Sequence, residues 1–186
     1  GGSTAELTIG VPALLQYLDY AGVALFAAPG ALVAARKGLD VLAFIFFASI
    51  TGVGGGTLRD VLLSQPVFWI SNPLYVAVPI GVAVLVYLAA QFLETGYGVL
   101  LWLDAIGLSA YAVMGAAKAL DIGAPSIVAI IMGMMTATVG GVLRDVVANE
   151  PSALLRRELY VTAALAGASV FTILAAWSIT EWIAVA

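Results

Sequence analysis

The stretch that decides the fold is Gly54-Gly55-Gly56-Thr57-Leu58-Arg59-Asp60, because it returns 85 positions later as Val139-Gly140-Gly141-Val142-Leu143-Arg144-Asp145. Both copies lie inside long apolar runs, where glycines weaken a helix and charges are costly. Sliding the whole chain by 85 positions also aligns Asp19 with Asp104 without a gap. Chance similarity between apolar segments explains matched Ala, Val and Leu, but not a matched Arg-Asp pair in one register. The sequence therefore predicts an internal duplication.

Composition indicates that the chain is an integral membrane protein. Of its 186 residues, 63% are hydrophobic and 10% are charged, and the mean hydropathy is +1.11. A soluble domain has about 25% charged residues. The chain has no cysteine and no histidine, which excludes disulfides, thiolate chemistry and the commonest metal ligand. We therefore expect no metal site, no cofactor and no enzymatic nucleophile–base set. The net charge of −4 provides no basic surface for nucleic acid.

Six apolar runs are long enough to cross a bilayer, which takes about 20 residues. They cover residues 12–35, 39–63, 74–93, 99–120, 125–148 and 159–179. We expect an all-α integral membrane protein with a tail at 1–13, whose Gly1-Gly2-Ser3 is typical of an expression remnant. A first three-helix repeat covers 14–93 and a second covers 98–180. The apolar end, 181–186, predicts the start of a truncated seventh span.

Three spans per repeat is an odd number, so the second repeat enters the membrane from the opposite side. Inverted repeats of this kind occur in proteins whose transport path lies at the repeat interface. Positive charges gather on one side of the predicted topology, at 36–37 and 156–157, against Lys118 alone on the other. Because positive loops stay in the cytoplasm, the N-terminus is expected outside.

The glycine clusters have two interpretations. They comprise Gly52, Gly54, Gly55 and Gly56 in the second span and Gly140 and Gly141 in the fifth, each beside a matched threonine, Thr51 or Thr136. Each glycine weakens a helix by about 1 kcal/mol relative to alanine. They either kink the helix and expose carbonyls to an ion or polar substrate, or they let helices pack closely. Their symmetric placement before an Arg-Asp pair favours the kink and a role in lining a pore.

Other glycines predict close packing of the first and fourth spans. Gly22 and Gly30 lie eight residues apart on one helix face, and so do their counterparts, Gly107 and Gly115. Phe26 and Tyr111, which lie between these glycines in each span, are expected in the core.

Arg59 and Arg144 lie deep within spans, where an unpaired arginine costs about 3 kcal/mol. Asp60 and Asp145 follow them directly and point about 100° away on a helix, which predicts that they are poor partners. Matching the depths of the spans instead predicts the ion pairs Asp19–Arg59 and Asp104–Arg144. The alternative is that the arginines reach the headgroups unpaired.

Lys118 breaks the symmetry of the repeats, because its counterpart is Val33. Its side chain either extends to the membrane interface or serves as a gating charge within the membrane field. The asymmetry favours a specialised role. The segment between the second and third spans, around Trp69, is expected to be an interfacial loop.

In these motifs the chain resembles the prokaryotic members of the trimeric intracellular cation (TRIC) channel family, a domain also labelled a glycine transporter. The resemblance covers essentially all of residues 14–180. It rests on Gly-Gly-Gly-Thr-Leu-Arg-Asp at 54–60, Gly-Gly-Val-Leu-Arg-Asp at 140–145, Gly-Ala-Ala-Lys-Ala-Leu at 115–120, Arg-Lys-Gly-Leu-Asp at 36–40, Arg-Arg-Glu-Leu-Tyr at 156–160 and Val-Phe-Trp at 67–69.

The resemblance implies seven spans, a homotrimer in the prokaryotic plasma membrane, and one cation path per protomer, conducting mainly potassium. That path passes the kinked second and fifth spans, and Lys118 matches the family's fourth-span lysine. The chain departs from the family in lacking most of the seventh span and in having Val139 opposite Gly54.

Three functions remain open from the residues alone. A channel would pass monovalent cations such as K⁺ or Na⁺ along a polar path. A secondary transporter would bind a small zwitterion such as glycine and alternate its access. A purely structural membrane subunit would leave the symmetric charges within the spans unexplained.

Overall fold

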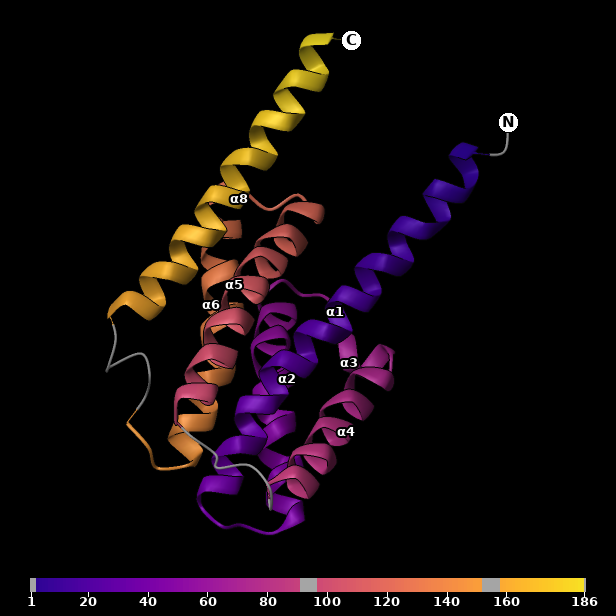
Figure 1. Ribbon diagram of the computed structural model, residues 1–186. Helices are drawn as coiled ribbons and strands as arrows, with labels where there is room; N and C mark the ends of the chain where they lie inside the picture. The colour runs from indigo at the N-terminus through magenta and orange to yellow at the C-terminus, as the bar shows by residue number, and fades with distance from the viewer. Residues whose placement is uncertain (1–2, 91–96, 152–157, 186) are drawn as a thin grey trace.

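The computed structural model describes residues 3–90, 97–151 and 158–185, and Figure 1 shows that these residues form a helical bundle. Within them there are seven helices and no strand. The helices are α1 (Ser3–Arg36), α2 (Val41–Leu62), α3 (Phe68–Ser71), α4 (Leu74–Ala89), α5 (Tyr97–Asp121), α6 (Ser126–Val147) and α8 (Glu158–Val185). An all-α fold is confirmed, with a helix at each of the six predicted spans.

The helix ends repeat at the same displacement of 85. Gly38 and Gly123, which end α1 and α5, have φ of 62° and 80°. Such positive φ is free of strain only for glycine, and it closes a helix by turning the chain back on its last carbonyls. Ser64 and Asn149, which follow α2 and α6, have φ of 53° and 51°. Both pairs of joints thus have the same backbone conformation, as expected from duplication.

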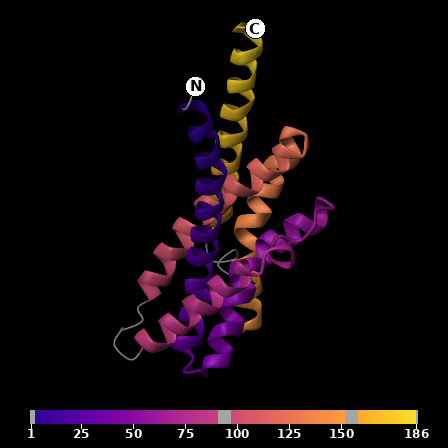
Figure 2. The ribbon, with the colours of Figure 1, turned by 90° about the vertical axis from the view of Figure 1, so that its right-hand side faces the viewer.

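Each half of the chain packs in the same way. In the first half, α1, α2 and α4 contact one another, and in the second α5, α6 and α8 do so. The halves meet where α2 contacts α6 and α1 contacts α5, as Figures 1 and 2 show from two sides. This arrangement confirms two three-helix repeats. The short helix α3 lies between α2 and α4 of the first, and its sequence counterpart, 153–156, falls outside the described residues.

Glycines allow the central helices to cross. A Cβ at Gly55 would overlap the carbonyl oxygen of Thr136, and one at Gly140 would overlap the carbonyl oxygen of Thr51. As the position on α2 rises, the facing position on α6 falls, so the two helices run antiparallel. The repeats are therefore inverted, and the C-terminal ends of α2 and α6 lie at opposite ends of the bundle.

Aromatic rings fill the contact between α1 and α5. Phe26 and its counterpart Tyr111 meet edge to face, with ring centroids 4.6 Å apart and an angle of 67°, a favourable geometry for an aromatic pair. Gly22 faces the ring of Tyr111, at 3.1 Å from a Cβ placed there, and Gly107 faces Phe26 at 2.8 Å. Both rings are buried, so close packing of the first and fourth spans is confirmed for Gly22 and Gly107. The prediction is wrong for Gly30 and Gly115, which face α2 and α6 instead.

One detail differs from the expectations. Residues 181–185 continue α8 without a break, because nothing between 168 and 185 is a glycine or proline that would end a helix. They do not begin a separate seventh helix. Length and apolarity alone mark three described helices as membrane spans, Val41–Leu62, Trp102–Asp121 and Ser126–Val147, whereas Leu74–Ala89 is a shorter apolar helix.

Candidate functional site

The charges inside the bundle form two clusters, one from each repeat. The second charge cluster consists of Asp104 on α5 and Arg144 and Asp145 on α6. Arg144 Nη1 and Nη2 donate to the two carboxylate oxygens of Asp104 at 2.7 and 2.9 Å, and Nε donates to Asp145 Oδ1 at 2.8 Å. All three residues are buried. The predicted ion pair of Asp104 with Arg144 is confirmed, in the two-bond geometry that makes arginine–carboxylate pairs strong.

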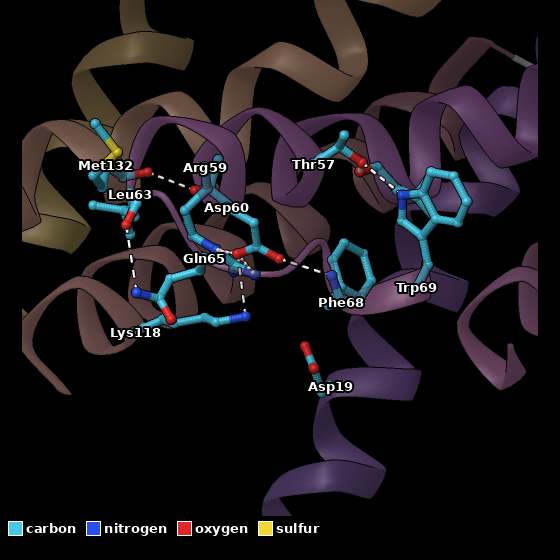
Figure 3. A network of polar contacts seen from close by, with 12 residues as sticks. Asp19, Thr57, Arg59, Asp60, Leu63, Gln65, Phe68, Trp69, Lys118 and Met132 are labelled. Atoms are coloured by element: carbon cyan, nitrogen blue, oxygen red, sulfur yellow. Dashed lines mark hydrogen bonds and ion pairs between the residues drawn. The ribbon is translucent and has the colours of Figure 1, made fainter. Parts of the chain in front are cut away.

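The first charge cluster consists of Asp19 on α1, Arg59 and Asp60 on α2, and Lys118 on α5 (Figure 3). Asp60 Oδ1 accepts from Arg59 Nε at 2.9 Å, lies 2.8 Å from Arg59 Nη2 and lies 3.1 Å from Lys118 Nζ. Its Oδ2 accepts from the backbone N–H of Phe68 at 3.0 Å. Asp60 is fully buried, and these donors compensate for its lost hydration.

The prediction that Asp60 and Asp145 are poor partners for the preceding arginines is wrong. In both repeats the arginine Nε donates to the carboxylate of the next residue. The 100° separation applies to the Cα–Cβ directions, but an arginine side chain is long enough to turn its guanidinium around the helix. Burial makes this pairing favourable, because neither charge can reach water.

The predicted pair of Asp19 with Arg59 is also wrong for this structure. Asp19 Oδ2 accepts instead from the hydroxyl of Tyr75 at 2.7 Å. The ring of Tyr75 packs on Phe68 at 4.8 Å, and the Arg59 guanidinium carbon lies 5.9 Å from the Phe68 centroid. Tyr75 and Phe68 thus lie between Asp19 and Arg59, and the described residues show no ion pair between these two charges. Sequence reasoning missed both, since neither carries a charge.

Lys118 does not extend freely to the membrane interface. Its Nζ contacts the buried Asp60, although the lysine side chain is 37% exposed. The amine therefore joins α5 to the end of α2. The two interpretations from the sequence, extension to the membrane interface and a gating charge, did not include a carboxylate partner on another span.

The segment expected as a loop around Trp69 contains α3, which packs on the end of α2. Trp69 Nε1 donates to Thr57 Oγ1 at 2.9 Å. The Phe68 ring covers Gly56, where a Cβ would come within 2.7 Å of it. Together with the Phe68 N–H bond to Asp60, these contacts hold α3 against the first charge cluster.

The glycine clusters lie within the continuous helices α2 and α6, and the kink of the second and fifth spans stays a prediction. Gly55 and Gly140 allow the close crossing of α2 and α6. The carbonyl of Gly52 accepts from the Tyr111 hydroxyl at 3.1 Å. Thr51 and Thr136, both buried, donate to the carbonyls four residues earlier, at 2.6 Å each. Close packing, the alternative interpretation, describes these residues better.

Gly54 differs from the other glycines of its cluster. It lies in a groove of about 510 Å³ between α2 and α6, lined by Phe46, Ile50, Gly54, Thr57, Leu58, Val61, Val139 and Leu143. Nearly all of these side chains are apolar, as expected for a surface that faces lipid. Gly141 is buried like Gly140.

One more ion pair joins the repeats at the end where α1 and α6 finish. Arg36 Nη2 lies 3.0 Å from Glu150 Oε1, and Lys37 Nζ lies 3.8 Å from the same oxygen. The described residues contain no group of three or more acidic side chains that could hold a metal ion.

Comparison with known families matches both halves of this chain. A family model described as a glycine transporter matches residues 16–91 and again 101–176. The two ranges lie 85 residues apart, which is the displacement of the repeated motif. The match therefore supports the duplication independently.

Related sequences come from bacterial membrane proteins. A UPF0126 membrane protein of Vibrio cholerae is 39% identical over 156 residues, which are 83% of this chain and 65% of that protein. The UPF0126 inner membrane protein YadS of Escherichia coli is 36% identical over 156 residues, 83% of this chain and 75% of the relative. The chain thus spans slightly less than two thirds of the Vibrio protein.

A solved structure has the same fold. It is the crystal structure of the TRIC trimeric intracellular cation channel orthologue from Rhodobacter sphaeroides, 48% identical, with a TM-score of 0.85. The similarity covers 88% of this chain and 85% of that one. This chain is therefore a member of the prokaryotic TRIC channel family, to which the glycine-transporter model and the UPF0126 membrane proteins also correspond.

Proposed function

We propose that the protein is a cation channel, permeable to potassium and other monovalent cations. The observation that carries this proposal is the match over most of the chain to the Rhodobacter structure, whose description names a trimeric cation channel. The trimer named for that structure supports a homotrimer with one path in each protomer, and the inner membrane relative supports a prokaryotic plasma membrane. The positive charges at 36–37 and 156–157 support an N-terminus outside. We infer no enzymatic activity, because the relatives are channels and membrane proteins.

We place the path beside α2 and α6, where buried polar groups continue along the centre of the bundle. Thr51, Thr136 and the hydroxyl of Tyr111 lie near the helix crossing. A charge cluster lies toward the C-terminal end of each of the two helices. Hydroxyl and carbonyl oxygens are the groups that replace water around a permeating cation. In this proposal the glycines keep the two helices close, and any kink develops only when the path opens.

A transporter of a small zwitterion is the second candidate, favoured by the description of the matching family model. Inverted repeats are common to transporters and channels, so the fold supports both. In the first charge cluster, the guanidinium of Arg59 and the carboxylate of Asp19 are not paired with each other. A zwitterion would require two such groups, one for its carboxylate and one for its amine.

Reconstitution of the purified protein into planar bilayers with a KCl gradient tests the proposal. Unitary current steps that reverse near the potassium equilibrium potential are the expected result. Saturable uptake of radiolabelled glycine into proteoliposomes, without current steps, would select the transporter instead. The variant Tyr111→Phe removes only the hydroxyl that donates to the Gly52 carbonyl, and it should lower the unitary current if the path passes the crossing.

A further inference from the structure

The two charge clusters come from matched positions but use their charges differently. In the second, one guanidinium serves two carboxylates, Asp104 and Asp145. In the first, two cations, Arg59 and Lys118, contact the single carboxylate of Asp60. The carboxylate of Asp19, the counterpart of Asp104, is held by the Tyr75 hydroxyl instead. The first cluster therefore has one more cation than the second, supplied by Lys118 where the other repeat has Val33.

Arg59 has hydrogen-bonding capacity that this arrangement does not use. Its Nε and Nη2 are directed to Asp60, and Nη1 has no hydrogen-bond partner among the described residues. The residue is only 5% exposed, and a buried donor without an acceptor is costly. In Arg144 the corresponding nitrogen donates to Asp104 at 2.7 Å.

The second cluster shows how Arg59 could be fully paired. There Nε stays on the neighbouring aspartate while Nη1 and Nη2 both bind the aspartate on the preceding repeat helix. The same rotation in the first repeat would keep Nε on Asp60 and turn Nη1 and Nη2 to Asp19. Asp60 would retain Lys118 and the N–H of Phe68, so no buried carboxylate would lose all its partners.

We propose that Arg59 is a two-position switch. In one position it binds Asp60 only, as in this structure, and in the other it also binds Asp19, which then releases the Tyr75 hydroxyl. Lys118 favours the exchange because its contact with Asp60 compensates for the Arg59 Nη2 contact that Asp60 loses in the second position. Arg144 has no such second position, because leaving Asp104 would remove the two guanidinium bonds that this buried carboxylate accepts.

The switch has a structural consequence at one end of the bundle only. Tyr75 packs on Phe68, and Phe68 lies on Gly56 and beside the Arg59 guanidinium. Moving Arg59 toward Asp19 therefore moves these rings at the end of α2. If the protein conducts as proposed above, this end contains the gate and the Asp104 end is a fixed support. The exchange itself does not depend on whether the protein is a channel or a transporter.

Side-chain NMR of the arginines tests the switch without any conduction measurement. The chain contains five arginines, so protein labelled with ¹⁵N-arginine gives few Nε–H signals, and Arg59→Lys identifies the signal of Arg59. We expect relaxation dispersion at Arg59 from a minor state populated at about 1–10%. Arg144 should show one state, and its unchanged signal in each variant shows that the protein is folded.

Two variants should remove the exchange for different reasons. Asp19→Asn removes the second acceptor, and Lys118→Met removes the cation that holds Asp60. In each case the minor population at Arg59 should fall at least about fivefold. Asp121→Asn, which neutralises an exposed charge at the end of the same helix as Lys118, is the control and should leave the population unchanged.

Three outcomes would overturn the proposal. Arg59 could show a single state in the unmodified protein, or its exchange could persist in Asp19→Asn. Arg144 could also exchange to the same extent as Arg59, which would indicate a symmetric motion of both repeats. Absence of potassium current with the NMR exchange intact would count against the proposed channel function alone.

Discussion

The two charge clusters occupy equivalent places in the two repeats, yet the arginine is fully paired with carboxylates in only one of them. In the second cluster every guanidinium nitrogen of Arg144 has a carboxylate partner. In the first, Asp19 is bound by Tyr75 and Arg59 lies against Phe68. The difference involves Lys118, which stands where the first repeat has Val33, and Phe68, whose counterpart in the sequence is Ala153. Duplication thus preserved the helix joints while a few substitutions redistributed the charges.

The largest expected effect on stability comes from breaking the ion pair of the second charge cluster. Asp104→Ala leaves the guanidinium of Arg144 buried without its two-bond partner, which should lower the free energy of unfolding by about 3–5 kcal/mol. Asp19→Ala removes one hydrogen bond from a tyrosine and should cost about 1 kcal/mol. Unfolding in mixed detergent micelles measures both. Equal losses would show that the two clusters contribute equally to the free energy of unfolding.

The helix crossing should respond equally in the two repeats. Gly55→Ala and Gly140→Ala each place a methyl group on the carbonyl of the facing threonine, and overpacking of this kind costs about 1–3 kcal/mol. Gly81→Ala is the control, because nothing lies within 4 Å of its Cβ position. It should be neutral or slightly stabilising, since alanine favours a helix. If one of the two crossing variants were harmless, the crossing would be less symmetric than the structure indicates.

The repeat and the spans could be predicted because they depend on patterns in the sequence itself and not on which side chains meet in space. Apolar length defines a span, and a matched Arg-Asp in one register defines the duplication. Depth matching also identified Asp104 as a partner of Arg144, although Asp145 shares the same guanidinium. The same argument failed for Asp19, since Tyr75 and Phe68 approach from a segment that was expected to be an interfacial loop.

The glycines show a second limit of sequence reasoning. A run such as Gly54–Gly56 weakens a helix in isolation, but tertiary contacts determine whether the helix breaks. Here α6 and the ring of Phe68 pack directly on Gly55 and Gly56, and the helix continues. Asp60, the partner of Lys118, could not be predicted either, because it lies about sixty residues away in the sequence and belongs to the other repeat.

Removing the extra cation should have a smaller effect on stability than removing Asp104. Lys118→Met deletes one of the contacts to Asp60, and the lysine side chain is 37% exposed. Solvent screening reduces such an interaction, so we expect a loss of about 1 kcal/mol. Asp60 retains Arg59 and the Phe68 N–H. A loss as large as that of Asp104→Ala would mean that Lys118, and not Arg59, is the main partner of Asp60.

The smallest effect is expected where the two ends of the bundle differ at the surface. Glu150 binds Arg36 with both side chains about one quarter exposed, so Glu150→Gln should cost about 0.5 kcal/mol and less in high salt. At the opposite end the matching positions are Gln65 and Asp121. Gln65→Glu would therefore introduce an acid where the expected neighbour is also acidic. It should destabilise slightly in low salt, and stabilisation there would contradict the inverted pairing of these joints.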